Sequence, residues 1–142
     1  GGEVVAAAST PEKLAAAKAC GAHETLLLDR AAPDFSAYKG HFDLVFDPVG
    51  GPAVMPALRT LRWGGRYLII GFVAGAPVSL PLNRLLRAGT EVIGVRAGEF
   101  AGLAAEGKIG PCAGGRVPLD RADEAFAAMA DGTLVGKAVV TI

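Results

Sequence analysis

The stretch FDLVFDPVGG, from Phe42 to Gly51, decides the fold predicted for this chain. Its first six residues are rich in apolar and aromatic side chains, which indicates a buried strand, and the proline and glycines that follow indicate a sharp turn. Beyond the turn, apolar residues recur at helical spacing between residues 54 and 61, so we expect a helix to begin at Pro52. A strand that leads through a tight turn into a helix is the repeating unit of an α/β protein.

The same alternation extends outward in both directions. Further strands are expected over residues 3–8, 25–28, 66–71 and 90–95, and further helices over residues 11–20, 82–87 and 99–106. Because consecutive parallel strands are joined by right-handed crossovers, this alternation predicts a parallel sheet with helices packed on it. The predicted fold class is therefore α/β, with a doubly wound parallel sheet.

The alternation gives way to a glycine-rich stretch at Pro111. From there we predict a separate return segment in which Asp120 caps a helix and residues 137–142 form a final strand. The predicted domain organisation is thus residues 1–110 as the main α/β domain and residues 111–142 as the C-terminal return segment.

Length and composition exclude several classes of protein. The chain has 142 residues, 51% of them hydrophobic and 20% charged, which suits one globular domain rather than a disordered chain. Its 14 basic residues balance 14 acidic ones, so electrostatics give no reason to expect nucleic acid or an anionic membrane as a partner. The most apolar run, residues 67–82, is interrupted by glycine and proline and is shorter than the ~20 residues of a spanning helix.

Two features bear on the cellular context. The only cysteines, Cys20 and Cys112, are too few for a disulfide framework, so we expect a reducing cytoplasm. Gly1 and Gly2 run directly into a predicted strand without an initiator Met, so we expect the sequence to be part of a longer protein.

Polar residues follow the first predicted strand, and in open parallel sheets ligands bind beyond the carboxyl ends of the strands. Ser9 and Thr10 come directly after this strand, and Lys13 comes one helical turn later. A dinucleotide-binding fold that takes NAD usually places Asp or Glu there, whereas Ser9 and Lys13 offer a donor and a positive charge that suit a 2′-phosphate. The alternative is that Ser9 and Thr10 cap the helix while Lys13 is solvated. Spacing alone leaves both interpretations open.

Glycines follow two other predicted strands. Gly50 comes after the strand at 42–47, and Gly71 ends the strand at 66–71 with Phe72 behind it. Such glycines let the backbone approach a flat cofactor, or they only permit a tight turn and the close packing of a strand on a helix. Both interpretations stay open at these positions.

No self-contained catalytic or metal-binding constellation is visible. His23 and His41 are isolated next to turns, and the two cysteines lack the spacing of zinc ligands. We therefore expect structural or surface roles for both histidines, no catalytic residue in this chain and no metal site.

Taken in order, these motifs resemble the medium-chain dehydrogenase/reductase superfamily, the group of zinc-type alcohol dehydrogenases and quinone oxidoreductases. The resemblance rests on residues 4–14, 19–22, 42–51, 64–72, 107–109, 118–122, 125–126 and 136–140. It covers most of the chain, and the order of the motifs is more specific than any single one. The quinone oxidoreductase-like, zinc-independent branch is the most similar.

The resemblance implies a Rossmann-type fold whose first strand and glycine-rich phosphate loop, which would precede Gly1, are missing. It implies NADP(H) as the cofactor and hydride transfer from the nicotinamide to a small electron-poor substrate, such as a quinone, an enone or a carbonyl compound. The cofactor-binding residues that it suggests are Ser9, Lys13 and Arg30 at the 2′-phosphate, Val49 and Gly50 along the cofactor, and Gly71, Phe72 and Val73 near the nicotinamide.

The resemblance also implies a homodimer, because members of this superfamily commonly pair through a sheet edge, here the strand expected at residues 90–95. An alternative from a different functional class stays open. In that alternative the chain is a non-catalytic, truncated module that keeps only a dimerisation or scaffold surface.

Overall fold

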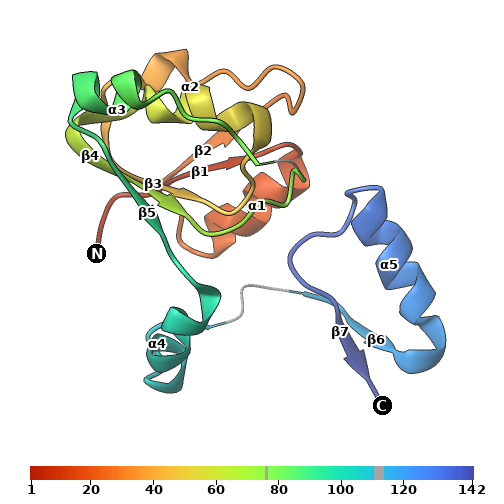
Figure 1. Cartoon of the computed structure of the whole chain (residues 1–142). Helices are drawn as coiled ribbons and strands as arrows, with labels where there is room; N and C mark the ends of the chain where they lie inside the picture. Colours follow the sequence, from red (N-terminus) through yellow and green to blue (C-terminus); the bar gives the residue numbers. More distant parts are fainter. Residues whose placement is uncertain (76, 111–113) are drawn as a thin grey trace. The chain divides into compact units, whose positions relative to one another are not determined.

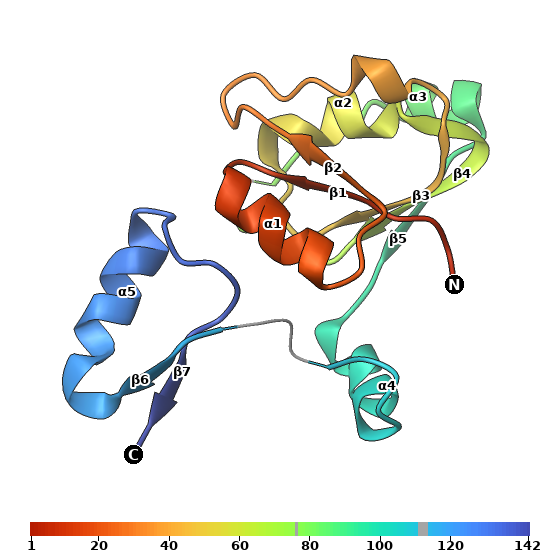
Figure 2. The same ribbon diagram turned by 180° about the vertical axis from the view of Figure 1, so that it is seen from behind.

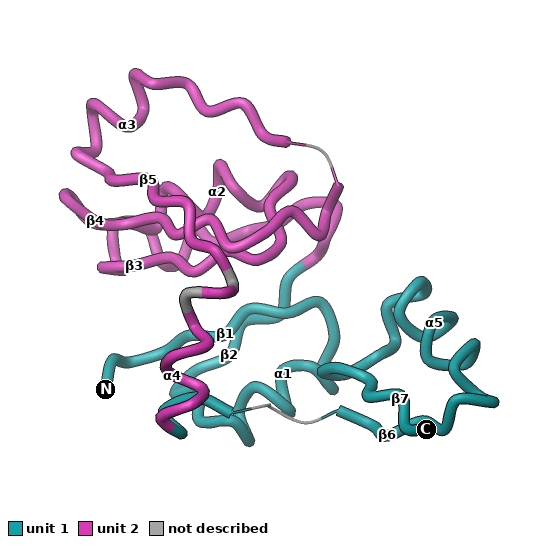
Figure 3. Tube along the Cα trace, turned by 60° about the horizontal axis from the view of Figure 1, so that its bottom comes forward, with its two compact units in different colours: residues 1–28, 107–142 teal, residues 29–106 magenta. Residues whose placement is uncertain are grey.

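The computed structural model describes residues 1–75, 77–110 and 114–142. The chain forms two compact units, one made of residues 1–28 with 107–142 and the other of residues 29–106 (Figure 3). Pro111 and Cys112 lie outside the described residues, and the domain boundary predicted after residue 110 stays a prediction.

The first unit contains two pairs of parallel strands, each joined through a helix. β1 (Val5–Ala8) pairs with β2 (Glu24–Leu27), and α1 (Pro11–Ala19) connects these strands and packs beside them (Figures 1 and 2). β6 (Arg116–Pro118) pairs with β7 (Val139–Thr141), and a 3-10 turn (Leu119–Arg121) followed by α5 (Ala122–Ala130) connects them.

The second unit is built on a three-stranded parallel sheet in the order β3-β4-β5, with β3 at Phe42–Asp47, β4 at Leu61–Ile69 and β5 at Glu91–Gly94. α2 (Val54–Leu58) leads from β3 to β4, α3 (Leu82–Ala88) leads into β5, and both helices contact β4 (Figure 1). α4 (Ala101–Ala105) follows β5, and 3-10 turns occupy Ser36–Tyr38, Gly51–Ala53 and Ala97–Phe100. Every strand pair that the structure describes is parallel, which confirms the predicted α/β class.

The start of α1 follows from its sequence. Thr10 has extended backbone angles, and its Oγ1 accepts the N–H of Lys13 at 3.4 Å, while Pro11 occupies a first helical position that needs no N–H donor. The helix ends before Gly21, whose φ of +99° is open to glycine at little cost. The predicted helix is therefore confirmed, and so is the capping role that was one of the two interpretations of Thr10.

β4 is longer than the predicted strand at 66–71, because it begins at Leu61. Phe42 pairs with Leu61, but Leu44 pairs with Arg66, so β4 carries extra residues that the ladder accommodates as a bulge. Gly64 lies in this segment with a φ of +73°, a conformation that other residues seldom adopt. Gly64 and Gly65 thus form an irregularity within β4, ahead of the residues for which a strand was predicted.

The prediction for Asp120 is wrong. Asp120 lies within the 3-10 turn, α5 begins at Ala122 with Arg121 at its N-cap, and no side chain caps the helix. The turn runs directly into the helix, and the Arg121 guanidinium binds the Glu124 carboxylate through two hydrogen bonds of 2.7 and 2.6 Å. The short strand β6 was not predicted, because a three-residue strand that ends in proline gives a weak sequence signal.

The fully buried side chains that the structure describes all lie in the second unit. Val54, Ala57, Leu61 and Tyr67 form this core, and Thr60 is buried beside them with its Oγ1 donating to the Ala57 carbonyl at 2.7 Å. The core fixes α2 to β4. No helix in the described ranges is both long enough and apolar enough to span a bilayer.

Candidate functional site

The loops that follow β3 and β4 run side by side in the second unit. The N–H of Ile70 donates to the Asp47 carbonyl at 2.9 Å, which continues the pairing past the end of β4. Farther along, the N–H of Ala74 donates to the Val49 carbonyl at 2.9 Å, and the N–H of Val73 to the Pro48 carbonyl at 3.4 Å. The two loops thus form one continuous surface at the carboxyl ends of the strands, where ligands bind in this class of sheet.

The Asp47 carboxylate holds the first of these loops in place. Its Oδ1 accepts the N–H groups of Val49 at 2.8 Å and Gly50 at 2.9 Å, and its Oδ2 accepts the Tyr67 hydroxyl at 2.6 Å. Hydrogen bonds to an ionised acceptor are shorter and stronger than neutral ones. Asp47 therefore joins the interior of β4 to the turn after β3.

Tyr67 is held as a neutral hydrogen-bond donor. Its side chain is 1% exposed. Burial, then the hydrogen bond to Asp47 and the charge of Asp47, raise the pKa of the Tyr67 hydroxyl far above its ordinary range. Tyr67 therefore stays protonated at neutral pH and donates its hydrogen to Asp47.

Gly50 and Gly71 have a structural reason to be glycine. Gly50 has a φ of +71°, and a Cβ placed on it would lie 3.3 Å from Cδ1 of Phe72. A Cβ on Gly71 would lie 3.1 Å from the Pro48 carbonyl oxygen. Gly50 lies at the tight turn between β3 and the 3-10 turn that follows, as one of the two interpretations predicts. The close packing observed at Gly71 is between the two loops, not of a strand on a helix.

The paired loops present apolar side chains outward. Phe72 is 52% exposed and Val73 is 83% exposed, and Val49 also lies open to solvent on the neighbouring loop. Exposed apolar groups beside a fixed backbone suit a flat ring better than a charged ligand. The structure therefore brings together Val49, Gly50, Gly71, Phe72 and Val73, all five of the residues predicted for this part of the cofactor.

The residues predicted for the 2′-phosphate lie elsewhere in the chain. Ser9 follows β1, and Lys13 lies one turn into α1, within the first unit. The Nζ of Lys13 donates to the Gly132 carbonyl at 2.6 Å, in the loop after α5. This contact between α1 and the C-terminal segment was not predicted, and it shows that Lys13 is not simply solvated.

Arg30 stands just beyond the end of β2, at the beginning of the second unit. The N–H of Leu28 still donates to the Ala8 carbonyl at 2.8 Å, so β1 and β2 end side by side. Asp29 then turns the chain, its Oδ1 accepting the N–H of Ala31 at 2.8 Å.

Sequence reasoning missed the pair that organises the loops, Asp47 and Tyr67. The signal for Asp47 was present, because an Asp followed by a proline and two glycines is typical of a turn in which the carboxylate accepts nearby backbone N–H groups. Tyr67 carried no comparable signal, since a tyrosine in an apolar strand is read as a packing residue.

The histidines have structural roles. The Nδ1 of His23 accepts the N–H of Val4 at 3.1 Å, and the His41 ring packs edge-on against Tyr38 and Phe42. In the residues that the structure describes, no group of three or more His, Cys, Asp and Glu side chains could hold a metal ion.

Comparison with known proteins is consistent with this architecture. The sequence model of the zinc-binding dehydrogenase family matches residues 1–106. The chain is similar to quinone oxidoreductase-like protein 2 of Bos taurus, with 27% identity over 159 residues that cover 99% of this chain and 46% of that protein. It is similar to acryloyl-coenzyme A reductase of Sulfurisphaera tokodaii, with 32% identity over 71% of this chain and 32% of that enzyme.

Among solved structures, the chain resembles a putative alcohol dehydrogenase from Sinorhizobium meliloti 1021, with a TM-score of 0.76 and 33% identity. The match covers 96% of this chain and 40% of that protein. The chain thus spans less than half the length of each of these three relatives. Because the family's sequence model matches most of its residues and the fold agrees, the chain belongs to the zinc-binding dehydrogenase family, within the medium-chain dehydrogenase/reductase superfamily.

Proposed function

We propose that this chain is the cofactor-binding portion of an NADPH-dependent oxidoreductase. The observation that carries the proposal is the pair of loops at the carboxyl ends of β3 and β4, fixed to each other through backbone hydrogen bonds and to the sheet through Asp47. A dinucleotide needs a preformed edge of this type, because ordering flexible loops upon binding would reduce its affinity.

The apolar side chains of these loops fit the nicotinamide end of the cofactor. Phe72 and Val73 would lie against the ring, and Val49 and Gly50 along the neighbouring ribose. When bound, NADPH supplies a hydride to an electron-poor carbon. The contribution of these residues is to orient the ring and to exclude water from one side of it.

At the other end of the cofactor we assign the 2′-phosphate to Ser9, Lys13 and Arg30. No Asp or Glu occupies residues 8–10. These positions therefore offer no carboxylate that would accept a hydrogen bond from the 2′-hydroxyl of NADH or repel a 2′-phosphate. An ammonium group has three hydrogens, so Lys13 can keep its bond to the Gly132 carbonyl and still donate to a phosphate.

The proposed substrates are small electron-poor molecules, namely quinones, enones or related carbonyl compounds. The names of two relatives, a quinone oxidoreductase-like protein and an acryloyl-coenzyme A reductase, support this class. We assign no catalytic residue to this chain. Asp47 and Tyr67 are the two proton-carrying groups that hold the described loops in place, and they are hydrogen-bonded to each other.

We also propose a homodimer that forms through β5. In the second unit β5 is an edge strand of the sheet, paired on one side with β4. An edge strand offers unpaired backbone groups that a second copy can complete.

The experiment is a comparison of NADPH and NADH, as ligands and as reductants of a simple quinone and a simple enone, in the full-length protein. We expect NADPH to be preferred by about tenfold or more, which one charge-assisted contact would supply. Ser9→Asp should reverse or abolish the preference, whereas Ala105→Asp, which adds the same charge on an exposed turn of α4, should not. A protein that binds neither nucleotide would instead be the non-catalytic module.

A further inference from the structure

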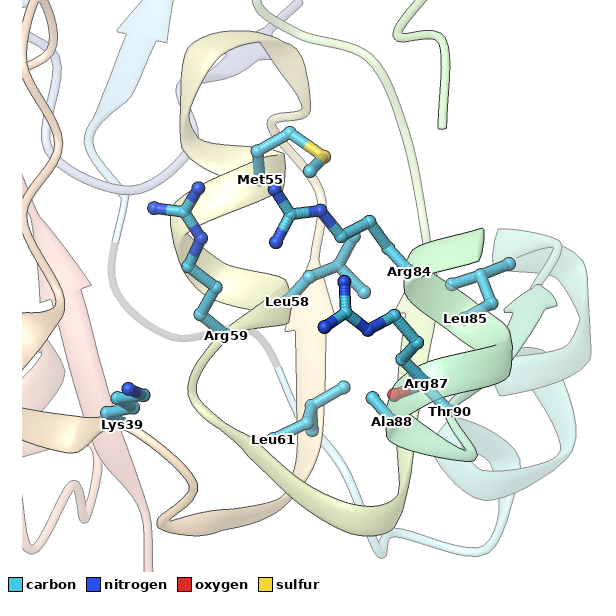
Figure 4. A pocket seen from close by; sticks show the side chains of 10 residues that line it. All are labelled: Lys39, Met55, Leu58, Arg59, Leu61, Arg84, Leu85, Arg87, Ala88 and Thr90. Atoms are coloured by element: carbon cyan, nitrogen blue, oxygen red, sulfur yellow. The ribbon is translucent and has the colours of Figure 1, made fainter. Parts of the chain in front are cut away.

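A separate pocket lies at the other end of the same sheet. Its volume is about 220 Å³, and it opens between α2 and α3 near the amino ends of the strands (Figure 4). Leu61, which begins β4, and Thr90, which directly precedes β5, both line it. The candidate cofactor loops follow Ile69 at the opposite end of β4, on the order of 20 Å away by the rise of a strand. The pocket is therefore distinct from the proposed cofactor site.

Positive charge gathers around this pocket without compensation. Lys39, Arg59, Arg84 and Arg87 line it, and no Asp or Glu is among its described lining residues. None of these four forms an ion pair with any residue in the described ranges of the chain. By contrast, Arg62 pairs with Asp43 and Arg66 with Glu91 on the same sheet. Like charges held near one another repel, so this arrangement favours binding of an anion.

The arginines are arranged to share a ligand. Figure 4 shows the side chains of Arg84 and Arg87 extending from α3 across the pocket toward α2, where Met55 and Leu58 form the facing wall. A guanidinium group presents a planar set of donors that matches a carboxylate or a phosphate. The leucines beneath these groups provide an apolar floor.

The Thr90 hydroxyl is a second, independent indication. Its Oγ1 is buried and has no hydrogen-bond partner among the described residues. A buried hydroxyl without a partner destabilises a fold, so native proteins seldom retain one without a function for it. A wholly solvated basic surface would account for the arginines but not for this hydroxyl. An anionic ligand in the pocket would accept its hydrogen.

We propose that this pocket binds a small organic anion, a phosphate or carboxylate group carried on a short apolar body. The basic residues and the Thr90 hydroxyl bind the head group, and the leucines and Met55 contact the body. The volume is below the 300–1,000 Å³ that is typical of sites for drug-sized ligands, which points to a body of only a few carbon atoms.

The test is calorimetric titration of the full-length protein with hexyl phosphate and with hexanoate, which distinguishes a phosphate head from a carboxylate head. Two control ligands complete the set: inorganic phosphate, which has the head group without the apolar body, and hexanol, which has the body without the charge. We expect at least one of the two anions to bind about tenfold or more tightly than either control ligand, and to bind more weakly as ionic strength rises. Equal binding of hexanol, or no binding of either anion, would overturn the proposal.

Matched double variants then locate the site. Arg84→Ala with Arg87→Ala should weaken binding by about tenfold or more, because two charge-assisted contacts are removed. Arg62→Ala with Arg66→Ala removes the same charge from exposed positions outside the pocket and should leave the affinity within about twofold. An equal loss in both double variants would show that net charge alone attracts the anion and would contradict the proposed site.

Discussion

The Tyr67 hydroxyl donates a hydrogen bond of 2.6 Å to Oδ2 of Asp47, which links the buried interior of β4 to the turn after β3. The other carboxylate oxygen of Asp47 accepts hydrogen bonds from the backbone N–H groups of Val49 and Gly50. A single side chain thus connects the core to the loop that we place against the cofactor.

Removal of the Tyr67 hydroxyl should destabilise the fold. We expect Tyr67→Phe to lower the free energy of unfolding by about 1–3 kcal/mol, because Oδ2 of Asp47 loses its donor. Asp47→Asn should have a similar effect, and the double variant should cost less than the sum, as expected for two groups in contact. Asp43→Asn is the control on the same strand and should change stability by no more than about 0.5 kcal/mol, since Asp43 forms an exposed ion pair. Urea denaturation measures all four variants, and equal effects at Asp43 and Asp47 would contradict the bracing role.

Tyr67 should also make stability depend on alkaline pH. Burial and Asp47 raise the pKa of its hydroxyl in the folded protein, whereas in the unfolded chain the hydroxyl titrates near pH 10. The stabilisation is therefore fully present below pH 10 and is lost as the pH rises above it, at about 1.4 kcal/mol per pH unit. The difference in unfolding free energy between the wild type and Tyr67→Phe should shrink between pH 9.5 and 11. A difference that stays constant over that interval would show that the hydroxyl titrates normally.

Thr60 and Thr90, whose hydroxyl groups are both buried, should respond to substitution by valine with opposite signs. Thr60→Val should destabilise the protein by about 1 kcal/mol, because its hydroxyl donates to the Ala57 carbonyl. Thr90→Val should stabilise the ligand-free protein by a similar amount, because it removes a buried hydroxyl without a partner in the described structure. Destabilisation by Thr90→Val would mean that this hydroxyl is satisfied without a ligand.

The proposed dimer should depend on the free edge of β5. The N–H of Val95 donates to the Ile69 carbonyl of β4 at 2.9 Å, so the N–H of Gly94, its neighbour in the strand, is directed to the outer edge. A Cβ on Gly94 would meet no atom within 4 Å. Gly94→Pro should therefore turn a dimer of the full-length protein into a monomer by light scattering, while Gly94→Ala should leave it a dimer. A Gly94→Pro protein that still dimerises would place the interface elsewhere.

Much of the fold could be predicted from local sequence signals. The strand at 42–47 was placed to the residue, and Thr10 with Pro11 gave the start of α1, because turn and cap residues act over short distances. The bulge in β4 and the strand β6 were not predicted. Both depend on pairing with a distant strand, which leaves only a faint trace in the local pattern.

The loops of the candidate site were predicted from the sequence, because glycines mark them. The contacts between side chains of different helices and strands were not predicted. The glycines at 50 and 71 marked the two loops, but nothing in the sequence showed that Asp47 and Tyr67 would meet or that Lys13 would reach Gly132. The basic pocket between α2 and α3 escaped notice for the same reason, since its arginines come from α3 and from the residue that follows α2 and show no motif along the chain.

The central claim is that the loop at Gly50 lies against the bound cofactor, and the affinity for NADPH of Gly50→Ala compared with that of Gly40→Ala tests it most directly. Both glycines have positive φ angles, of +71° and +67°, so alanine strains the backbone at each, and strongly at Gly50, whose ψ of −149° places it in a region that only glycine adopts readily. A Cβ on Gly50 would press on the Phe72 ring at 3.3 Å, whereas a Cβ on Gly40 would meet nothing within 4 Å. In the full-length protein we predict that Gly50→Ala weakens NADPH binding by about tenfold or more and Gly40→Ala by less than about twofold. Equal affinities in the two variants would contradict the claim that NADPH lies against these loops.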